Sequence, residues 1–455
     1  MLKRLFAVSC IFLSGLTPTP ASNSVTRADM EIIGSFTVNP FPVAAVEPLS
    51  ISNRQLADDF IDLTMELETG TSLPVFTRFE GPISVRLQGA VPAPLPSELN
   101  RLLARLRSEA NIDIYQTKAP TANINIHAIS RRQIRKTFPM AACFVAPNVE
   151  NLAEFQKFRR TAKTSWSQQA VRTKVSIFLP SDATPQEIRD CLHEEFAQSM
   201  APLNDMYRLP NSVFNDDNVH TILTNFDMMI LKIAYSPELR SGMTREDLRQ
   251  RLPSILSHLN PRGDAKRYSY VKPTSREWNT AITTALGPGT PPQMRPRAAK
   301  RALEIAQTER YNDHRLGFSY FALGRVIQHQ DPSYAFEMFR IANEVYAKSV
   351  NAELYAAHTA AQIAATQIAL GNGEDALLTL AQHIDVAFDN ENAALLSTLM
   401  LLRAEALELT GRASEAQKVR LDSLTWARYG FGSESNLKSK LREINALNPL
   451  KRNNG

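Results

Sequence analysis

The chain has 455 residues, of which 44% are hydrophobic and 21% charged, and its formal net charge is +5. This length predicts two or more domains with an ample core. We interpret the basic clusters at residues 131–136 and 157–163 as solvated surface. Without a recognised nucleic-acid-binding module, an exported chain of this charge is not expected to bind nucleic acid.

The N-terminus has the pattern of an export signal. Lys3 and Arg4 precede an apolar run from Leu5 to Leu16, and a small, proline-rich segment offers a cleavage site after Ala21. We therefore predict a secretory signal peptide over residues 1–21. The apolar run is too short to anchor the chain in a bilayer, and we expect no integral membrane span elsewhere.

After an irregular lead-in over residues 22–50, helical and strand-like patterns alternate. Apolar residues at helical spacing predict two helices, and β-type runs predict strands around them. In chain order we expect a helix through Leu56–Leu67, a bent strand over Val75–Phe79 and Ile83–Leu87, a helix through Leu99–Leu106, and strands at Ile112–Tyr115, Ile124–Ile129 and Lys174–Leu179.

The last of these strands leads into the helix that carries the most informative residues. Thr184–Glu187 is a capping box with proline at the first helical position. On a helical wheel Glu195 lies within the apolar face, and Glu194 and Gln198 lie beside it. His193 points away from Gln198, so we expect it to be exposed and not a ligand. A carboxylate on an apolar face needs a partner, a cation or a water-filled cleft.

The spacing of these residues resembles the metzincin zinc-peptidase pattern His-Glu-x-x-His-x-x-Gly-x-x-His. The position of the general base is kept as Glu195, whereas the three ligand positions carry Glu194, Gln198 and Asn204, which Asp205 could supplement. The resemblance implies a zincin-like fold. Neutral amide oxygens bind zinc poorly, and an all-oxygen set favours harder ions.

A closer resemblance covers the same part of the chain. The stretches Cys191–Gln198, Pro202–Pro210 and Phe214–His220 resemble domain-of-unknown-function family 2927 of bacterial envelope proteins. This resemblance implies a bacterial, periplasmic setting but no activity. A second capping box, at Thr224–Asp227, predicts a helix running to Tyr235.

Two cysteines, Cys143 and Cys191, remain after the predicted signal peptide is removed. An exported protein with two cysteines is expected to join them in a disulfide. The bond would tie the segment around Cys143 to the helix that carries Glu195. The alternative is a pair of buried free thiols.

The C-terminal part of the chain is predicted to be helical. Residues 286–296, rich in proline and glycine, form the clearest linker, and residues 446–455 form a tail. Between them, Ala335, Ala376 and Ala416 are 41 and 40 residues apart. This period indicates stacked helical hairpins that resemble tetratricopeptide repeats. A plain helical bundle is the alternative.

Together these patterns predict an α+β fold, with a zincin-like domain over residues 51–285 and an all-α, tetratricopeptide-like domain over residues 297–445. We expect a periplasmic binding or scaffolding protein, a pseudo-peptidase without cofactor, whose helical repeats bind a protein partner. The alternative is an atypical metallopeptidase that binds zinc or a harder divalent ion through Glu194, Gln198 and Asn204 or Asp205, with Glu195 as general base. In a third interpretation the helical domain carries the function, and the first domain only supports it.

Overall fold

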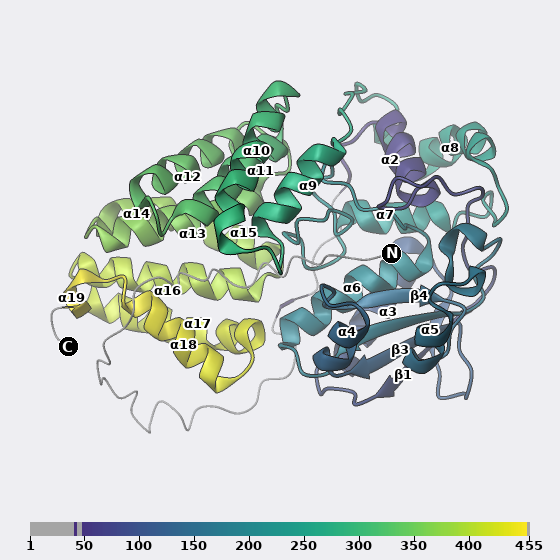
Figure 1. Cartoon of the computed structure of the whole chain (residues 1–455), viewed down its shortest axis with the longest axis horizontal. Helices are drawn as coiled ribbons and strands as arrows, with labels where there is room; N and C mark the ends of the chain where they lie inside the picture. The colour runs from purple at the N-terminus through teal and green to yellow at the C-terminus, as the bar shows by residue number, and fades with distance from the viewer. Residues whose placement is uncertain (1–40, 43–47, 453–455) are drawn as a thin grey trace. The chain divides into compact units, whose positions relative to one another are not determined.

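The computed structural model describes residues 41–42 and 48–452. They divide into two compact units, one made largely of residues 48–274 and the other largely of residues 275–452 (Figure 1). The predicted signal peptide and most of the predicted lead-in lie outside the described residues. Among the helices that the structure describes, none is long and apolar enough to cross a lipid bilayer.

The first unit is built on a mixed sheet of five strands in the order β2-β1-β3-β5-β4. Neighbouring strands are parallel from β2 to β5, and only the pairing of β4 with β5 is antiparallel. All six residues of β5 are buried, as expected for a central strand covered on both faces. The strands are β1 (Ile83–Gly89), β2 (Ile114–Gln116), β3 (Ile124–Ile129), β4 (Phe144–Pro147) and β5 (Val175–Pro180).

Helices cover both faces of this sheet. Ile177 and Phe178 of β5 point to opposite faces because side chains alternate along a strand. The Ile177 face packs against α3 (Leu95–Ala110) and α6 (Pro185–Met200) in the main core. The Phe178 face packs against the two short helices α4 (Arg131–Thr137) and α5 (Leu152–Phe158).

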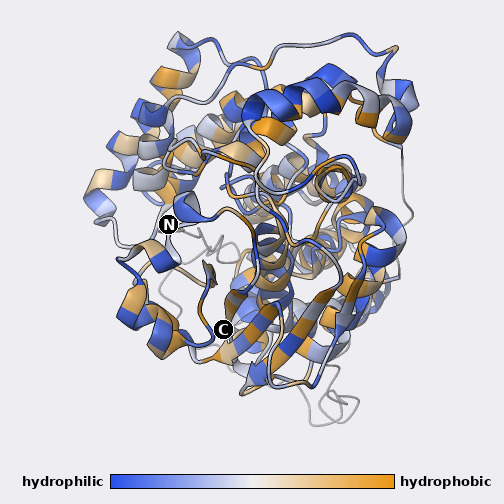
Figure 2. Cartoon of the chain, turned by 90° about the vertical axis from the view of Figure 1, so that its right-hand side faces the viewer, coloured by the Kyte–Doolittle hydropathy of each residue, from blue (hydrophilic) through white to orange (hydrophobic). Residues whose placement is uncertain are grey.

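Three further helices complete the first unit: α2 (Asn53–Met65), α7 (Asn225–Ala234) and α8 (Arg245–Leu259). The predicted helix through Leu56 is confirmed as α2, and the capping box at Thr224 and Asp227 is confirmed at the start of α7. Hydrophobic and hydrophilic residues alternate along the helices of the chain (Figure 2). In α2 the buried Leu56, Phe60 and Leu63 recur at helical spacing on one side of the helix.

The predicted strand at residues 75–79 is wrong. This segment makes only an isolated bridge, between Phe79 and Arg172. Its backbone instead bonds to the segment before α8: the Phe76 N–H donates to the Met243 carbonyl at 2.8 Å, and the Arg78 N–H donates to Ser241 Oγ at 3.0 Å. The β-type side chains fill the core, but their backbone groups have partners outside the sheet.

The second unit is helical, as predicted. Its helices are α9 (Arg276–Leu286), α10 (Arg295–Thr308), α11 (His314–Ile327), α12 (Pro332–Tyr346), α13 (Glu353–Ala369), α14 (Gly373–Leu380), α15 (His383–Asp389), α16 (Ala393–Leu409), α17 (Ala413–Phe431), α18 (Glu434–Asn445) and α19 (Pro449–Arg452). Helices that follow one another pack together, most extensively α11 with α12 and α16 with α17.

A period of about 40 residues is visible in this unit. Ala335, Ala376 and Ala416 are each the fourth residue of a helix, α12, α14 and α17, and all three are buried. Gly371 and Gly411 stand at equivalent turns, with φ of 83° and 77° that other residues rarely adopt. The alanines thus mark the place where the second helix of each pair packs against the first.

Candidate functional site

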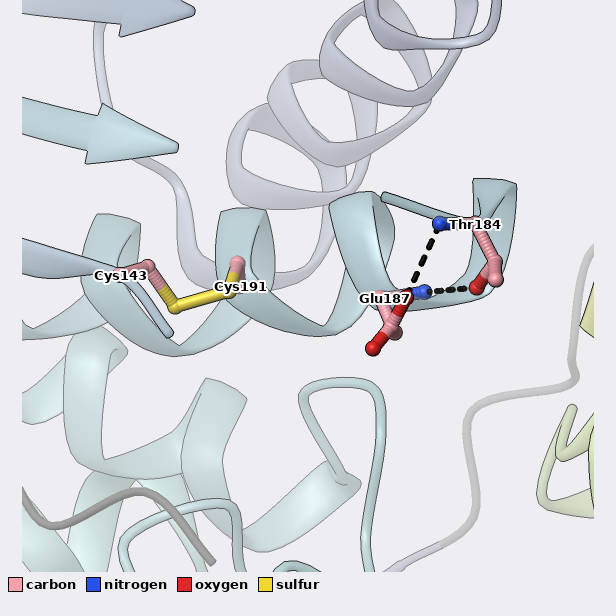
Figure 3. Close-up of a disulfide and its surroundings, with 4 residues drawn as sticks. All are labelled: Cys143, Thr184, Glu187 and Cys191. Carbon is pink, nitrogen blue, oxygen red and sulfur yellow. Dashed lines mark hydrogen bonds between the residues drawn. A yellow bond between two sulfur atoms is a disulfide. The ribbon is translucent and has the colours of Figure 1, made fainter. Parts of the chain in front are cut away.

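The helix α6 carries the residues singled out by sequence. The Thr184 Oγ1 accepts from the Glu187 N–H at 3.1 Å, and the Glu187 carboxylate accepts from the Thr184 N–H at 3.0 Å, so the predicted capping box is confirmed (Figure 3). Glu195 is fully buried, as its place on the apolar face predicts. Glu194 is half-buried.

The expectation that His193 is exposed is wrong. Its side chain is 4% exposed, and its Nδ1 accepts a hydrogen bond of 3.0 Å from the Leu223 N–H. Burial lowers the pKa of His193 well below its usual value, and nearby Arg105 and Arg189 lower it further. The helical wheel missed this because the segment that precedes α7 covers the side of α6 opposite its apolar face. A neutral His193 is thus a structural acceptor.

The C-terminal end of α6 is held by a buried arginine that the sequence analysis did not single out. Arg172 donates to the carbonyl oxygens of Gln198 and Ala201, both at 2.6 Å, and to Thr77 Oγ1 at 3.2 Å. Its guanidinium also lies 4.8 Å from the centre of the Trp166 ring. Burial lowers the pKa of Arg172 to about 9, so the group stays charged at neutral pH. A cation at this end of a helix interacts favourably with the negative end of the helix dipole.

The amide groups of Gln198 and Asn204 act as hydrogen-bond donors. Gln198 Nε2 lies 3.3 Å and 3.4 Å from the two carboxylate oxygens of Asp205, and Asn204 Nδ2 donates to the Asp62 carbonyl at 3.0 Å. The Asn204 N–H also donates to the Leu63 carbonyl. The structure therefore brings Gln198 and Asp205 together, but directs Asn204 to the end of α2.

Cys143 and Cys191 form a disulfide, with Cα atoms 6.0 Å apart (Figure 3). The bond joins the segment that precedes β4 to the second turn of α6. The Cys143 sulfur and one carboxylate oxygen each of Glu194 and Glu195 lie within 4.8 Å of one another. Because the sulfur is bonded to Cys191, it is not a thiolate and is not available to a metal ion.

Three carboxylates near the motif pair with arginines. Arg208 pairs with the buried Asp59 and, at 2.8 Å, with Asp62 of the same helix, α2. Arg245 of α8 pairs with Glu66 at 2.8 Å. The Arg208 pairs fix α2 against the segment that contains Asn204, and the Arg245 pair joins the end of α2 to α8. Sequence reasoning missed them because each joins residues far apart along the chain.

Two of the three predicted ligand positions carry amides, and the third carries the Glu194 carboxylate. Zinc binds imidazole, thiolate and carboxylate groups. The neutral amide oxygens of Gln198 and Asn204 are poor zinc ligands. The Cys143 sulfur is in a disulfide, and Nδ1 of His193 accepts from the backbone. What the arrangement provides is a rigid, densely buried helix held at both ends.

The first unit is therefore an α+β domain with a mixed sheet and a buried, disulfide-tethered helix. Residues 53–254 match the family described as "Protein of unknown function (DUF2927)", which confirms the family resemblance expected from the sequence over that segment. No curated protein and no solved structure matches the chain.

Proposed function

We propose that this chain is a periplasmic binding or scaffolding protein. In this proposal the first unit is a metzincin-like domain that has lost its zinc, and the helical unit captures a protein partner through tetratricopeptide-like repeats. The observation that carries the proposal is the donor set: of the three ligand positions, two are occupied by amides that donate hydrogen bonds, Gln198 and Asn204. The order of strand, helix, strands and β5 leading into α6 supports the zincin-like assignment.

The periplasmic setting is supported by the disulfide between Cys143 and Cys191, which suits an oxidising compartment.

Partner binding is supported by large apolar side chains that the helical unit leaves exposed. Val350, Leu370 and Leu378 are 79%, 68% and 76% exposed, respectively. Such residues are common contact points in protein interfaces when they gather on one surface.

A peptidase assay tests the loss of catalysis. We expect neither the wild type nor Glu195→Gln to cleave an unfolded protein substrate, and we expect the substitution to change stability because Glu195 is fully buried. The exposed Glu246→Gln serves as the matched control for removal of one carboxylate. Turnover by the wild type that disappears in Glu195→Gln but persists in Glu246→Gln would establish the alternative, an atypical metallopeptidase.

The alternative, an atypical metallopeptidase, keeps one supporting observation, the proximity of the Glu194 and Glu195 carboxylates.

A capture experiment tests the proposal that the helical unit binds a protein partner. Tagged full-length protein, cross-linked in the envelope, should recover a specific protein. We expect this recovery to fail for Leu370→Asp with Leu378→Asp and to persist for Val91→Asp, a control in the first unit that is 37% exposed. Equal recovery by all three proteins would contradict a role for this helical surface.

A further inference from the structure

Positive charge is concentrated in one segment of the first unit. Residues 131–163 contain eight lysines and arginines against two glutamates, a net charge of +6, whereas the whole chain carries only +5. Both glutamates are paired, Glu154 with Lys163 at 2.6 Å and Glu150 with Lys174. The cations form a basic surface whose exposed members are Arg132, Arg135, Lys136, Lys157, Arg159, Arg160 and Lys163.

The basic surface lies on two helices that are fixed to each other. Figure 1 shows α4 and α5 beside the sheet. Ile134 of α4 and Phe155 of α5 belong to one apolar cluster with Phe178 of β5. At the end of α4, Thr137 accepts from Gln156 Nε2 at 2.9 Å through its hydroxyl and from Arg159 Nη1 at 3.3 Å through its carbonyl. The cations of both helices therefore belong to one continuous surface of fixed geometry.

A pocket of about 280 Å³ opens beside this surface. Its lining combines the aromatic side chains of Phe138, Phe155 and Trp166 and the half-buried Val145 of β4 with the exposed Arg159 and Arg160. The Arg172 guanidinium lies over the Trp166 ring, 4.8 Å from its centre. The pocket thus has a mixed lining, in which aromatic rings stand beside the side chains of two arginines.

We propose that this pocket and the basic surface bind an acidic segment of another protein. One large apolar side chain of that segment enters the pocket, and carboxylates on either side of it pair with Arg159 and Arg160. Arginine suits this role because its planar group binds carboxylate in a bidentate manner. The site lies in the first unit and does not depend on the role proposed for the helical unit.

Size and shape favour a protein segment over other polyanions. The volume of about 280 Å³ is sufficient for one large side chain and lies at the lower end of the range for pockets that enclose small molecules, roughly 300–1,000 Å³. Membrane-binding surfaces insert apolar groups into the lipid. Here the rings of Phe155 and Trp166 are buried, 7% and 5% exposed, so the ligand must supply the protruding group. A polysaccharide has charge but no side chain of this kind.

Fluorescence anisotropy with labelled peptides tests the site in the full-length protein. The probe is an acidic peptide with one central phenylalanine, compared with the same peptide carrying alanine at the centre. The variant Arg159→Glu with Arg160→Glu reverses the charge at the pocket. Its matched control, Arg262→Glu with Arg267→Glu, reverses two other exposed arginines of the first unit. Val145→Trp fills the pocket and keeps every charge, and thermal melting monitors the fold of each variant.

We expect the wild type and the control to bind the phenylalanine peptide equally, and the Arg159/Arg160 variant to bind it about tenfold more weakly. The alanine peptide should bind the wild type at least about tenfold more weakly, because the burial of the phenylalanine ring is lost. Val145→Trp should bind both peptides equally.

Three results would overturn the proposal. The first is equal binding by the Arg159/Arg160 variant and its control. The second is equal binding of the two peptides by the wild type. The third is tighter binding of phosphatidylglycerol vesicles or of a thymidine oligonucleotide than of the phenylalanine peptide, which would assign the basic surface to a lipid or to a nucleic acid.

Discussion

Removal of the Cys143–Cys191 disulfide should lower the stability of the first unit by an amount that follows from its place in the chain. The two residues are 48 positions apart. In the chain-entropy description, a loop of this length restricts the unfolded state by about 4 kcal/mol. Both cysteines are buried, with exposures of 0% and 5%, so the perturbation is Cys143→Ala with Cys191→Ala, which places no hydroxyl group in the core.

For a domain of this size, about 1 kcal/mol corresponds to roughly 2–4 °C in melting temperature, so we expect a decrease of about 8–16 °C. Thermal unfolding followed by circular dichroism measures it. A phosphine reductant should lower the melting temperature of the wild type by a similar amount and leave the double variant unchanged. A decrease below about 2 °C, or alkylatable thiols in the native exported protein, would refute the reasoning.

Three further predictions concern single side chains. Arg172→Leu removes the donors to two carbonyls at the end of α6 and should cost about 2–5 kcal/mol in urea unfolding, with Arg172→Lys restoring part of the loss; a change below about 1 kcal/mol would contradict the role given to this guanidinium. Burial lowers the pKa of His127 to about 4, so below pH 6.5 the unfolded chain binds a proton that the folded chain does not, and the free energy of unfolding falls as the pH falls. Between pH 7 and pH 5, His127→Gln should lose about 2 kcal/mol less of its unfolding free energy than the wild type. Urea unfolding measures this, and the same pH dependence in both proteins would refute it. Gly324→Ala would bring a Cβ to 2.7 Å from the Phe339 ring and should destabilise the helical unit by about 1–3 kcal/mol in thermal unfolding. An unchanged melting temperature would contradict the close packing of α11 against α12 at this point.

Local signals were sufficient for much of the fold. The buried strand at Ile124–Ile129 and the capping boxes at Thr184–Glu187 and Thr224–Asp227 could be predicted because each depends on neighbouring residues alone. In the helical unit the predicted spacing places Ala335 and Ala376 at the same buried position near the start of a helix.

What the sequence could not predict depends on contacts between distant segments. Residues 75–79 have strand-forming side chains, but their backbone is satisfied by residues 241–243. His193 is buried by a segment that follows α6, and Arg172 gives no local signal of its contacts at the end of that helix. Of the predicted site, Glu195 occupies the expected buried face, whereas the contacts of Asn204 with α2 could not be foreseen from spacing.

The zinc content of the purified protein tests the central claim most directly. Elemental analysis of the full-length chain should find far less than one zinc ion per chain, and the melting temperature should be the same with and without a chelator, because Gln198 and Asn204 donate hydrogen bonds and Cys143 is bonded to Cys191. One tightly bound metal ion per chain, whose removal by the chelator lowers the melting temperature, would contradict the account.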